Sequence, residues 1–249
     1  MVERVQQRLW IFDFDGTLSP LVPDRQRARL HPDCQRMLED LVALSGQKVA
    51  VLSSRSLEDL LPRIAVPGVY LGGGSGVEWQ LPDGRRVRPS REWEERLGVK
   101  RGSLLGELVA MTALPGVEVE DKKWSLAIHT RQASLEGRRE LYARIAAWQS
   151  PEVSIFSGPE VLEIQLLPEV DKAFGVRSLC NLLKFDPSRG SLVYAGDDEN
   201  DAVAMRWAIQ LGGAALLVGA SFPVAGAILV SNQQALVSVV EGMAGISRR

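Results

Sequence analysis

The sequence is poor in the features that mark secreted, membrane-spanning or nucleic-acid-binding proteins. Among 249 residues there are only two cysteines, Cys34 and Cys180, which lie in helix-like segments and are more typical of separate thiols than of a disulfide or a metal-ligand pair. A net charge of −2 argues against a general nucleic-acid or membrane-surface partner. No apolar run reaches the length of a membrane span, and the charged residues 1–8 precede too short an apolar run for a signal peptide. We therefore expect a cytoplasmic, monomeric protein.

Strand and helix signals alternate along a chain that is 45% hydrophobic, which is typical of a globular α/β protein. Between residues 91 and 167 the order changes to helix, strand, strand, helix, strand, strand, which indicates a small inserted α+β domain. The predicted fold is a Rossmann-like parallel-sheet core, formed by residues 1–90 and 168–249, with an inserted α+β cap domain at residues 91–167.

The stretch from residue 9 to residue 20 carries the clearest chemical signal. An apolar run predicts a buried strand that ends in Asp13 and Asp15. Residues two apart on an extended chain point to the same side, so both acids would enter the crevice at the carboxyl end of the strand. Gly16 allows a tight turn and Thr17 offers a hydroxyl. Two carboxylates this close repel each other, so the site needs a cation or a shared proton.

This stretch resembles the first motif, Asp-x-Asp-Gly-Thr, of the haloacid dehalogenase superfamily of phosphotransferases. The resemblance implies that Asp13 attacks phosphorus and becomes an aspartyl phosphate. It implies that Asp15 protonates the leaving alcohol and later activates water. It also implies a magnesium ion that offsets the repulsion between the carboxylates and the substrate phosphate.

Later segments resemble the other motifs of the superfamily in the expected order. Ser53 follows a predicted strand and would hydrogen-bond the transferring phosphoryl group, and Lys172 would neutralise Asp13 and the phosphate. Asp197 opens a run that resembles Gly-Asp-x-x-x-Asp and would bind the metal directly, with a later acid of the run acting through water. The expected catalytic residues are Asp13, Asp15, Ser53 and Lys172. The expected magnesium ligands are Asp13, Asp15, Asp197, Asp198 and Asp201.

Within the superfamily the chain resembles the trehalose-6-phosphate phosphatase family. The insert lies between the second and third motifs, as it does in members with a large cap at that point. Further similarity lies in residues 13–20, 52–55, 74–78, 119–123, 125–131, 162–164, 171–172 and 196–198. In that family a Glu-x-Lys of the cap and a later Glu bind sugar hydroxyls, which here would be Glu120, Lys122 and Glu163. The full set of expected substrate-binding residues is Arg55, Gly74, Glu78, Glu120, Lys122, His129, Arg131 and Glu163.

Some positions depart from the family pattern. Ser54 stands where the family has glycine, Ser75 where it has histidine, and Gln165-Leu166 where it has Arg-Pro; the glycine expected right after the motif lysine is displaced to Gly175. We expect a magnesium-dependent phosphatase of trehalose 6-phosphate. The alternatives are a phosphatase of sucrose, glucosylglycerol or mannosylglycerate phosphate, a non-catalytic sugar-phosphate-binding module, and a phosphomutase. The charged residues of the expected cap are also typical of a solvent-exposed hairpin that binds no ligand.

Overall fold

The chain forms two compact units. The computed structural model describes residues 7–22, 24–148, 153–158, 160–167, 169–189, 191–219 and 222–246. The core unit comprises the chain up to Val87 and from Asp171 onward, and the cap unit comprises Arg88–Val170. The expected limits were residues 90 and 168. Residues 1–6, on which the expectation about a signal peptide depends, lie outside the described part.

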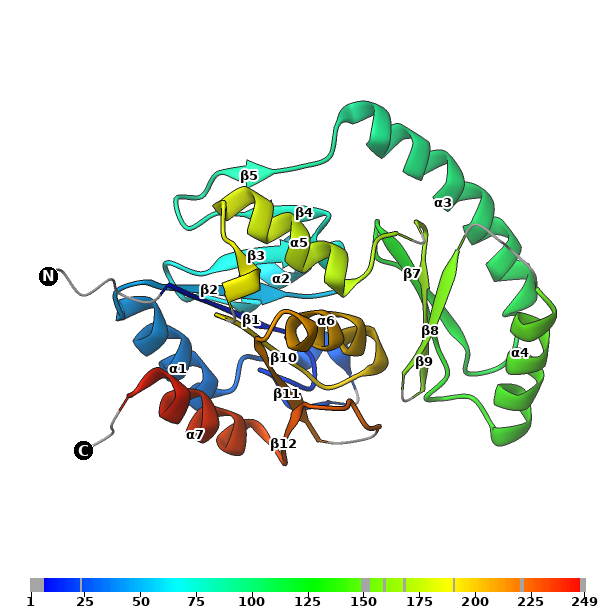
Figure 1. Cartoon of the computed structure of the whole chain (residues 1–249). Coiled ribbons are helices and arrows are strands. Elements are labelled where there is room, and N and C mark those ends of the chain that lie inside the picture. The colour runs from blue at the N-terminus through cyan, green and yellow to red at the C-terminus, as the bar shows by residue number, and fades with distance from the viewer. Residues whose placement is uncertain are drawn as a thin grey trace, which may run out of the picture. The chain divides into compact units, whose positions relative to one another are not determined.

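The core unit is built on an eight-stranded sheet with the strand order β12-β11-β10-β1-β2-β3-β4-β5 (Figure 1). The strands from β12 to β3 run parallel, whereas β4 and β5 join the edge antiparallel. The strands are β1 (Arg8–Phe12), β2 (Gln47–Leu52), β3 (Tyr70–Gly73), β4 (Glu78–Gln80), β5 (Arg86–Val87), β10 (Leu192–Gly196), β11 (Ala214–Val218) and β12 (Ile228–Val230). The predicted α/β class with a parallel sheet is therefore confirmed.

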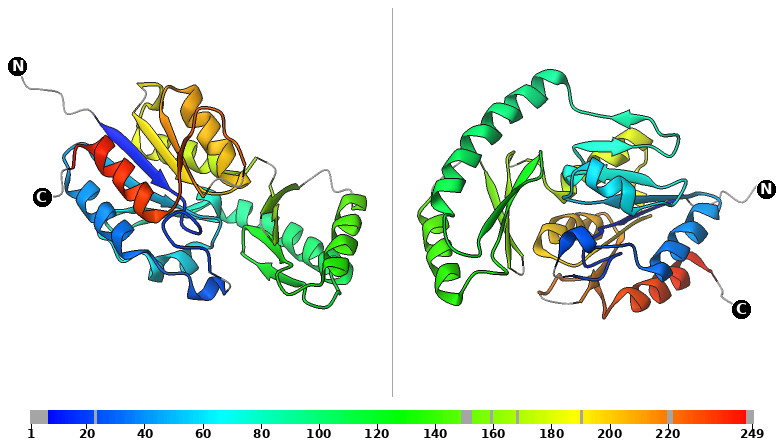
Figure 2. Two further views of the ribbon diagram at one scale, coloured as in Figure 1. Left: turned by 90° about the horizontal axis from the view of Figure 1, so that it is seen from below. Right: turned by 180° about the vertical axis from the view of Figure 1, so that it is seen from behind.

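Helices cover both faces of the core sheet. Alternate residues of β1 point to opposite faces: Trp10 and Phe12 belong to the apolar layer under α1, α2 and α7, and Leu9 and Ile11 belong to the layer under α5 and α6 (Figures 1 and 2). The helices are α1 (Pro32–Ala43), α2 (Leu57–Leu60), α5 (Lys172–Leu183), α6 (Glu199–Gln210) and α7 (Gln233–Ala244). A parallel sheet buried on both faces is the doubly wound arrangement.

The two cysteines lie in opposite apolar layers. Cys34 belongs to the layer under α1 and Cys180 to the layer under α5, and both are buried and unpaired. Burial raises the pKa of each thiol to about 12, so both stay protonated at neutral pH. The expectation of separate thiols agrees with this placement.

Local chemistry sets the ends of two helices. After Leu60, α2 passes into a 3-10 turn at Leu61–Arg63, because Pro62 has no backbone N–H to donate. The helix at Arg91–Met111 begins after Ser90, because the Ser90 hydroxyl accepts a hydrogen bond from the Trp93 N–H at 3.3 Å and caps the helix.

The cap unit has one antiparallel sheet with two helices along one of its faces (Figures 1 and 2). The strand order is β6-β7-β9-β8. Its elements are α3 (Arg91–Met111), β6 (Glu118–Asp121), β7 (Ser125–His129), α4 (Leu135–Ala147), β8 (Ser154–Gly158) and β9 (Val161–Gln165). Leu126, Ile128, Leu162 and Ile164 share one face of this sheet and are buried, whereas the other face carries polar side chains. The alternation of side chains along each strand produces this division.

Within the described residues, we find no helix with the combined length and apolar character that crossing a membrane requires.

Candidate active site

The candidate site lies where three neighbouring strands of the core sheet end. Asp197, Asp13 and Ser53 come directly after β10, β1 and β2, which lie side by side in the sheet. Because these strands are parallel, the residues that follow them meet at one edge, where ligands bind in open α/β sheets. The sheet thus brings residues from three separate motifs to one place.

The loop after β1 is fixed from several directions. The backbone N–H of Asp13 donates to the carbonyl of Ala195 at 2.9 Å, and the Asp13 side chain is almost completely buried. Gly16 has a φ of +81°, and a Cβ added there would lie 1.9 Å from Oδ2 of Asp197, so only glycine fits. The Gln233 amide of α7 donates to the Gly16 carbonyl at 2.8 Å. The loop is therefore held against both the acidic loop and the last helix.

Lys172 is the buried cation of the site. It is the first residue of α5, after the N-cap Asp171, and it is 2% exposed. Its ammonium group donates to Oδ1 of Asp13, to Oδ1 of Asp201 at 3.1 Å and to the Leu52 carbonyl at 3.0 Å. Burial alone would lower the pKa of Lys172, but the negative charges of Asp13 and Asp201 outweigh it and raise that pKa above its ordinary value. Lys172 therefore stays charged.

Asp201 organises the acidic loop that follows β10. Its Oδ1 accepts hydrogen bonds from Lys172 and, at 2.6 Å, from the Tyr194 hydroxyl, and its Oδ2 accepts one from the backbone N–H of Asp197 at 3.1 Å. A Cβ on Gly196 would lie 2.3 Å from Cγ of Asp201, so this carboxylate packs directly against the strand end. Both oxygens of Asp201 accept hydrogen bonds from protein donors, so this side chain fixes the conformation of the loop after β10.

Three carboxylates form a compact acidic cluster: oxygens of Asp13, Asp197 and Asp201 all lie within 4.8 Å of one another. Burial raises the pKa of Asp13 well above its usual range, partly opposed by Lys172. Burial, followed by the charge of Asp13, likewise raises the pKa of Asp197. Among the described residues the Asp197 carboxylate accepts no hydrogen bond. One lysine does not balance this set of acids, and carboxylate oxygens are the ligands that magnesium prefers, so the cluster fits a divalent cation.

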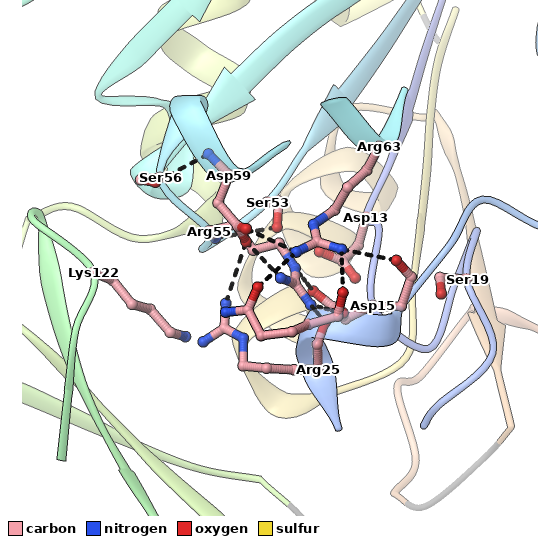
Figure 3. Close-up of polar contacts among 12 residues, drawn as sticks. Asp13, Asp15, Ser19, Arg25, Ser53, Arg55, Ser56, Asp59, Arg63 and Lys122 are labelled. Carbon is pink, nitrogen blue, oxygen red and sulfur yellow. Dashed lines mark hydrogen bonds and ion pairs between the residues drawn. The ribbon is translucent and has the colours of Figure 1, made fainter. Parts of the chain in front are cut away.

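Asp15 and Asp198, also expected as metal ligands, lie outside this cluster. Oδ1 of Asp198 accepts a hydrogen bond from the Asp201 N–H at 3.1 Å and caps α6, and burial raises the pKa of Asp198 to about 7. The carboxylate of Asp15 accepts two hydrogen bonds from Arg55, from Nε at 2.6 Å and from an Nη at 2.7 Å. The structure thus places the Asp15 carboxylate with an arginine and not with the other acids (Figure 3).

Ser53 and the glycine-rich turn lie beside the acidic cluster in the core unit. The Ser53 hydroxyl accepts a hydrogen bond from the Arg55 N–H at 3.1 Å, which leaves its own proton to donate. The Gly74 N–H donates to the Arg55 carbonyl at 2.7 Å, and the Ser75 N–H donates to the Ser53 carbonyl at 2.9 Å. Gly74 and Glu78 are both buried, and that they contact a substrate stays a prediction.

The cap residues expected to bind sugar gather on the polar face of the cap sheet. Glu120, Ala127 and Glu163 are direct neighbours across β6, β7 and β9, so their side chains share that face. Glu163 accepts hydrogen bonds from the Lys122 ammonium group and, at 2.6 Å, from the Ser125 hydroxyl. These groups form a preorganised polar patch.

His129 and Gln165 extend this patch, whereas Arg131 does not. The His129 ring forms a 2.8 Å hydrogen bond with Glu120. The Gln165 side chain lies next to Ser125 on the same face, and its amide nitrogen is buried without a partner among the described residues. Arg131 donates at 2.7 Å to Glu160, beyond the end of β7, and so belongs to a separate ion pair.

A family comparison agrees with this arrangement. The model of the trehalose-phosphatase family matches residues 11–218, which include every motif residue described above. The chain belongs to the trehalose-phosphatase family. Trehalose-phosphate phosphatases of Mycobacterium tuberculosis (strain H37Rv) and Mycobacterium avium (strain 104) are 33% and 35% identical over 195 residues, or 76% of this chain. That match covers 48% of each relative, so the chain spans about half the length of these trehalose-phosphatase family members.

Solved structures share the fold. The C-terminal domain of a Candida albicans trehalose-6-phosphate phosphatase matches with a TM-score of 0.76 at 18% identity, over 97% of this chain and 93% of that one. A trehalose-6-phosphate phosphatase related protein matches with a TM-score of 0.73 at 19% identity, over 96% and 98%. A Bacteroides thetaiotaomicron phosphatase of the haloalkanoate enzyme superfamily matches with a TM-score of 0.59 at 14% identity, over 99% and 98%. These likenesses agree with the predicted fold of a parallel-sheet core with an inserted cap.

Sequence reasoning missed residues that support the site from outside the motifs. Tyr194 bonds Asp201, and Gln233 holds the loop at Gly16, although 217 positions separate these last two residues. Asp59 bonds Arg55. Tyr194 lies two residues before Gly196 on an apolar stretch of sequence. Because a buried hydroxyl needs a hydrogen-bond partner, this tyrosine could have been identified from the sequence as a support of the site.

Proposed function

We propose that the protein is a magnesium-dependent phosphatase that hydrolyses trehalose 6-phosphate through an aspartyl phosphate. The observation that carries the proposal is the placement of Lys172 between Asp13 and Asp201, beside Asp197. Membership of the trehalose-phosphatase family and the names of the mycobacterial relatives support the choice of substrate.

Asp13 and Asp197 would hold the magnesium ion. Both have raised pKa values because they are buried among other acids. Among the described residues, Lys172 is bonded to Oδ1 of Asp13, whereas Oδ2 of Asp13 and the Asp197 carboxylate accept no hydrogen bond. Asp201 would contribute through the same cluster, and Asp198 and Asp15 through water. When bound, the ion would neutralise the carboxylates and the phosphoryl oxygens, so that an anionic nucleophile can approach an anionic substrate.

In the first step, an Asp13 oxygen attacks phosphorus, and the bond between phosphorus and the sugar oxygen breaks. Asp15 gives its proton to the departing alcohol. Lys172 opposes the effect of burial on the pKa of Asp13 and faces the negative charge, and the Ser53 hydroxyl has a free proton to donate to a phosphoryl oxygen. In the second step, Asp15 takes a proton from water, the water oxygen attacks phosphorus, and inorganic phosphate leaves Asp13 free again.

The polar face of the cap sheet would recognise the sugar. Glu120, Lys122 and Glu163 are held by hydrogen bonds to neighbours on that face, so their orientation is set before a ligand binds. Gln165 would add a donor, because its buried amide nitrogen has no partner in the described part of the chain. Unpartnered buried donors cost about 1–3 kcal/mol, and a sugar hydroxyl would remove that cost.

A panel of phosphorylated sugars tests the proposal. With magnesium present, kcat/KM should be highest for trehalose 6-phosphate, ahead of sucrose 6-phosphate, glucosylglycerol phosphate, mannosylglycerate phosphate and glucose 6-phosphate. Excess chelator should abolish turnover, and Asp13→Asn should lack activity on every member. Transfer of the phosphoryl group to a second sugar hydroxyl, in place of release as phosphate, would indicate a phosphomutase and overturn the proposal.

A further inference from the structure

A cluster of charged side chains lies beside the loop after β1 in the core unit. It consists of Arg25, Arg55, Arg63 and Asp59, together with Asp15 (Figure 3). Asp15 leaves β1 on the way to the first helix, whereas Asp59 lies in the first turn of α2, where its N–H donates to the Ser56 hydroxyl at 3.3 Å. We call this set the arginine cluster.

Arg55 is the centre of the arginine cluster. Its guanidinium group is completely buried, and it donates to both oxygens of Asp15, to the Arg25 carbonyl at 2.9 Å and to Oδ2 of Asp59. It also lies over the Phe14 ring, with 5.6 Å to the ring centroid. A planar guanidinium group that donates several hydrogen bonds at once has little freedom to rotate. Arg55 therefore fixes the orientation of the Asp15 carboxylate.

Asp59 has no direct part in the chemistry. In the described part of the chain its carboxylate contacts only arginines: Arg55, Arg63 at 2.8 Å and Arg25 at 3.9 Å. Burial would raise the pKa of Asp59, but hydrogen bonds from Arg63 and Arg55 outweigh it and lower that pKa. Asp59 therefore stays ionised, and its contacts reach no residue of the acidic cluster. Among the three arginines, Arg55 is the one that also bonds Asp15 in the described part of the chain, so it connects Asp59 with Asp15.

We propose that Asp59 is a positioning residue for the phosphatase reaction: it anchors Arg55, and Arg55 in turn holds the Asp15 carboxylate in place as general acid and base. The inference rests on the proposed function, in which Asp15 has that role. Without Asp59, one Nη of Arg55 loses its carboxylate partner inside the protein, and the guanidinium can turn away from Asp15. A misplaced general acid slows proton transfer without changing how the substrate is bound.

The variant Asp59→Asn should keep KM for trehalose 6-phosphate and lower kcat by about tenfold or more, the upper limit being the hundred- to ten-thousand-fold contribution of general acid–base catalysis. With p-nitrophenyl phosphate, whose leaving group needs no proton, the variant should show a burst of p-nitrophenol followed by a slower steady rate. Asp33→Asn is the matched control, because Asp33 also lies in the first turn of a helix and bonds an arginine, Arg36, which has no contact with Asp15 among the described residues. It should leave both steps unchanged.

A double-mutant cycle separates positioning from a merely structural role. If Asp59 acts through Asp15, the substitution Asp59→Asn should slow the steady-state rate of the unmodified protein strongly. In the Asp15→Asn variant, the same substitution should change the steady-state rate by less than about twofold. Equal slowing in both backgrounds, or an Asp59→Asn protein with the parent's kcat, would overturn the inference. If the unmodified protein hydrolysed neither trehalose 6-phosphate nor p-nitrophenyl phosphate, the proposed function would be overturned, and the inference with it.

Discussion

The ammonium group of Lys172 donates a hydrogen bond to Oδ1 of Asp13, and both side chains are almost completely buried, which limits screening of the contact by solvent. The same ammonium group reaches Asp201, so one cation connects the expected nucleophile with the acid that shapes the loop after β10. A buried pair with further hydrogen bonds is costly to break, because the partner that remains is a buried charge without compensation. Loss of Lys172 is therefore expected to affect both the activity and the stability of the protein.

Lys172→Met should abolish turnover and lower the free energy of unfolding by about 3–5 kcal/mol in metal-free protein, because Asp13 and Asp201 lose their cation. Urea unfolding followed by circular dichroism measures the change. Lys184→Met, at the exposed end of the same helix, is the control and should unfold like the parent. Equal stability of the two variants would contradict the described role of Lys172.

Metal-free protein should lose stability as the pH rises from about 4 to about 7. The pKa of Asp198 is raised from 3.8 to about 7, so within this window the folded state binds more protons than the unfolded state, and the free energy of unfolding falls with rising pH. Asp198→Asn keeps the helix cap but removes this titration, so its thermal midpoint in chelator should depend less on pH than that of the parent. Identical pH profiles for the two proteins would count against the raised pKa of Asp198.

Glu163→Gln should raise KM for trehalose 6-phosphate while leaving hydrolysis of p-nitrophenyl phosphate nearly unchanged. A charged hydrogen bond to a sugar hydroxyl is worth about 1.5–3 kcal/mol, or roughly 10- to 150-fold in affinity. Glu136→Gln, an exposed acid in the first turn of α4 in the same unit, is the control. If Glu163→Gln impaired both esters equally, the polar face of the cap would be structural and not selective.

Gln165→Leu should make the protein more stable and its sugar binding weaker. Leucine removes a buried amide nitrogen that has no partner within the described ranges, so the thermal midpoint should rise. The lost donor should raise KM for trehalose 6-phosphate. A lower thermal midpoint with an unchanged KM would show that the amide has a structural role instead.

The sequence predicted the parts of the site that depend on local pattern. Asp13, Ser53 and Asp197 each follow an apolar run, and strand ends of a parallel sheet meet at one edge whatever the details of the packing. The pairing of Asp15 with Arg55 could not be predicted in this way. From the sequence alone, a carboxylate two residues from the expected nucleophile could bind either a metal or an arginine, and the packed structure pairs it with Arg55.

Long-range supports of the site were equally out of reach of the sequence. The hydrogen bond from Gln233 to Gly16 depends on where the last helix lies on the sheet. Asp59 looks like an ordinary acid in the first turn of a helix, and its partners Arg25 and Arg63 lie in two separate 3-10 turns that no periodicity brings together. Such contacts are set by tertiary packing, which residue patterns do not encode.

Chemical trapping of the intermediate tests the central claim most directly. Protein mixed with trehalose 6-phosphate and magnesium is quenched in acid within one turnover and digested, and the peptides are analysed by mass spectrometry. The account predicts one phosphoryl group on the peptide that contains Asp13, absent from Asp13→Asn and more abundant in Asp15→Asn when p-nitrophenyl phosphate is the donor. Turnover of trehalose 6-phosphate with no phosphoryl group on Asp13, or with the group on another residue, would contradict it.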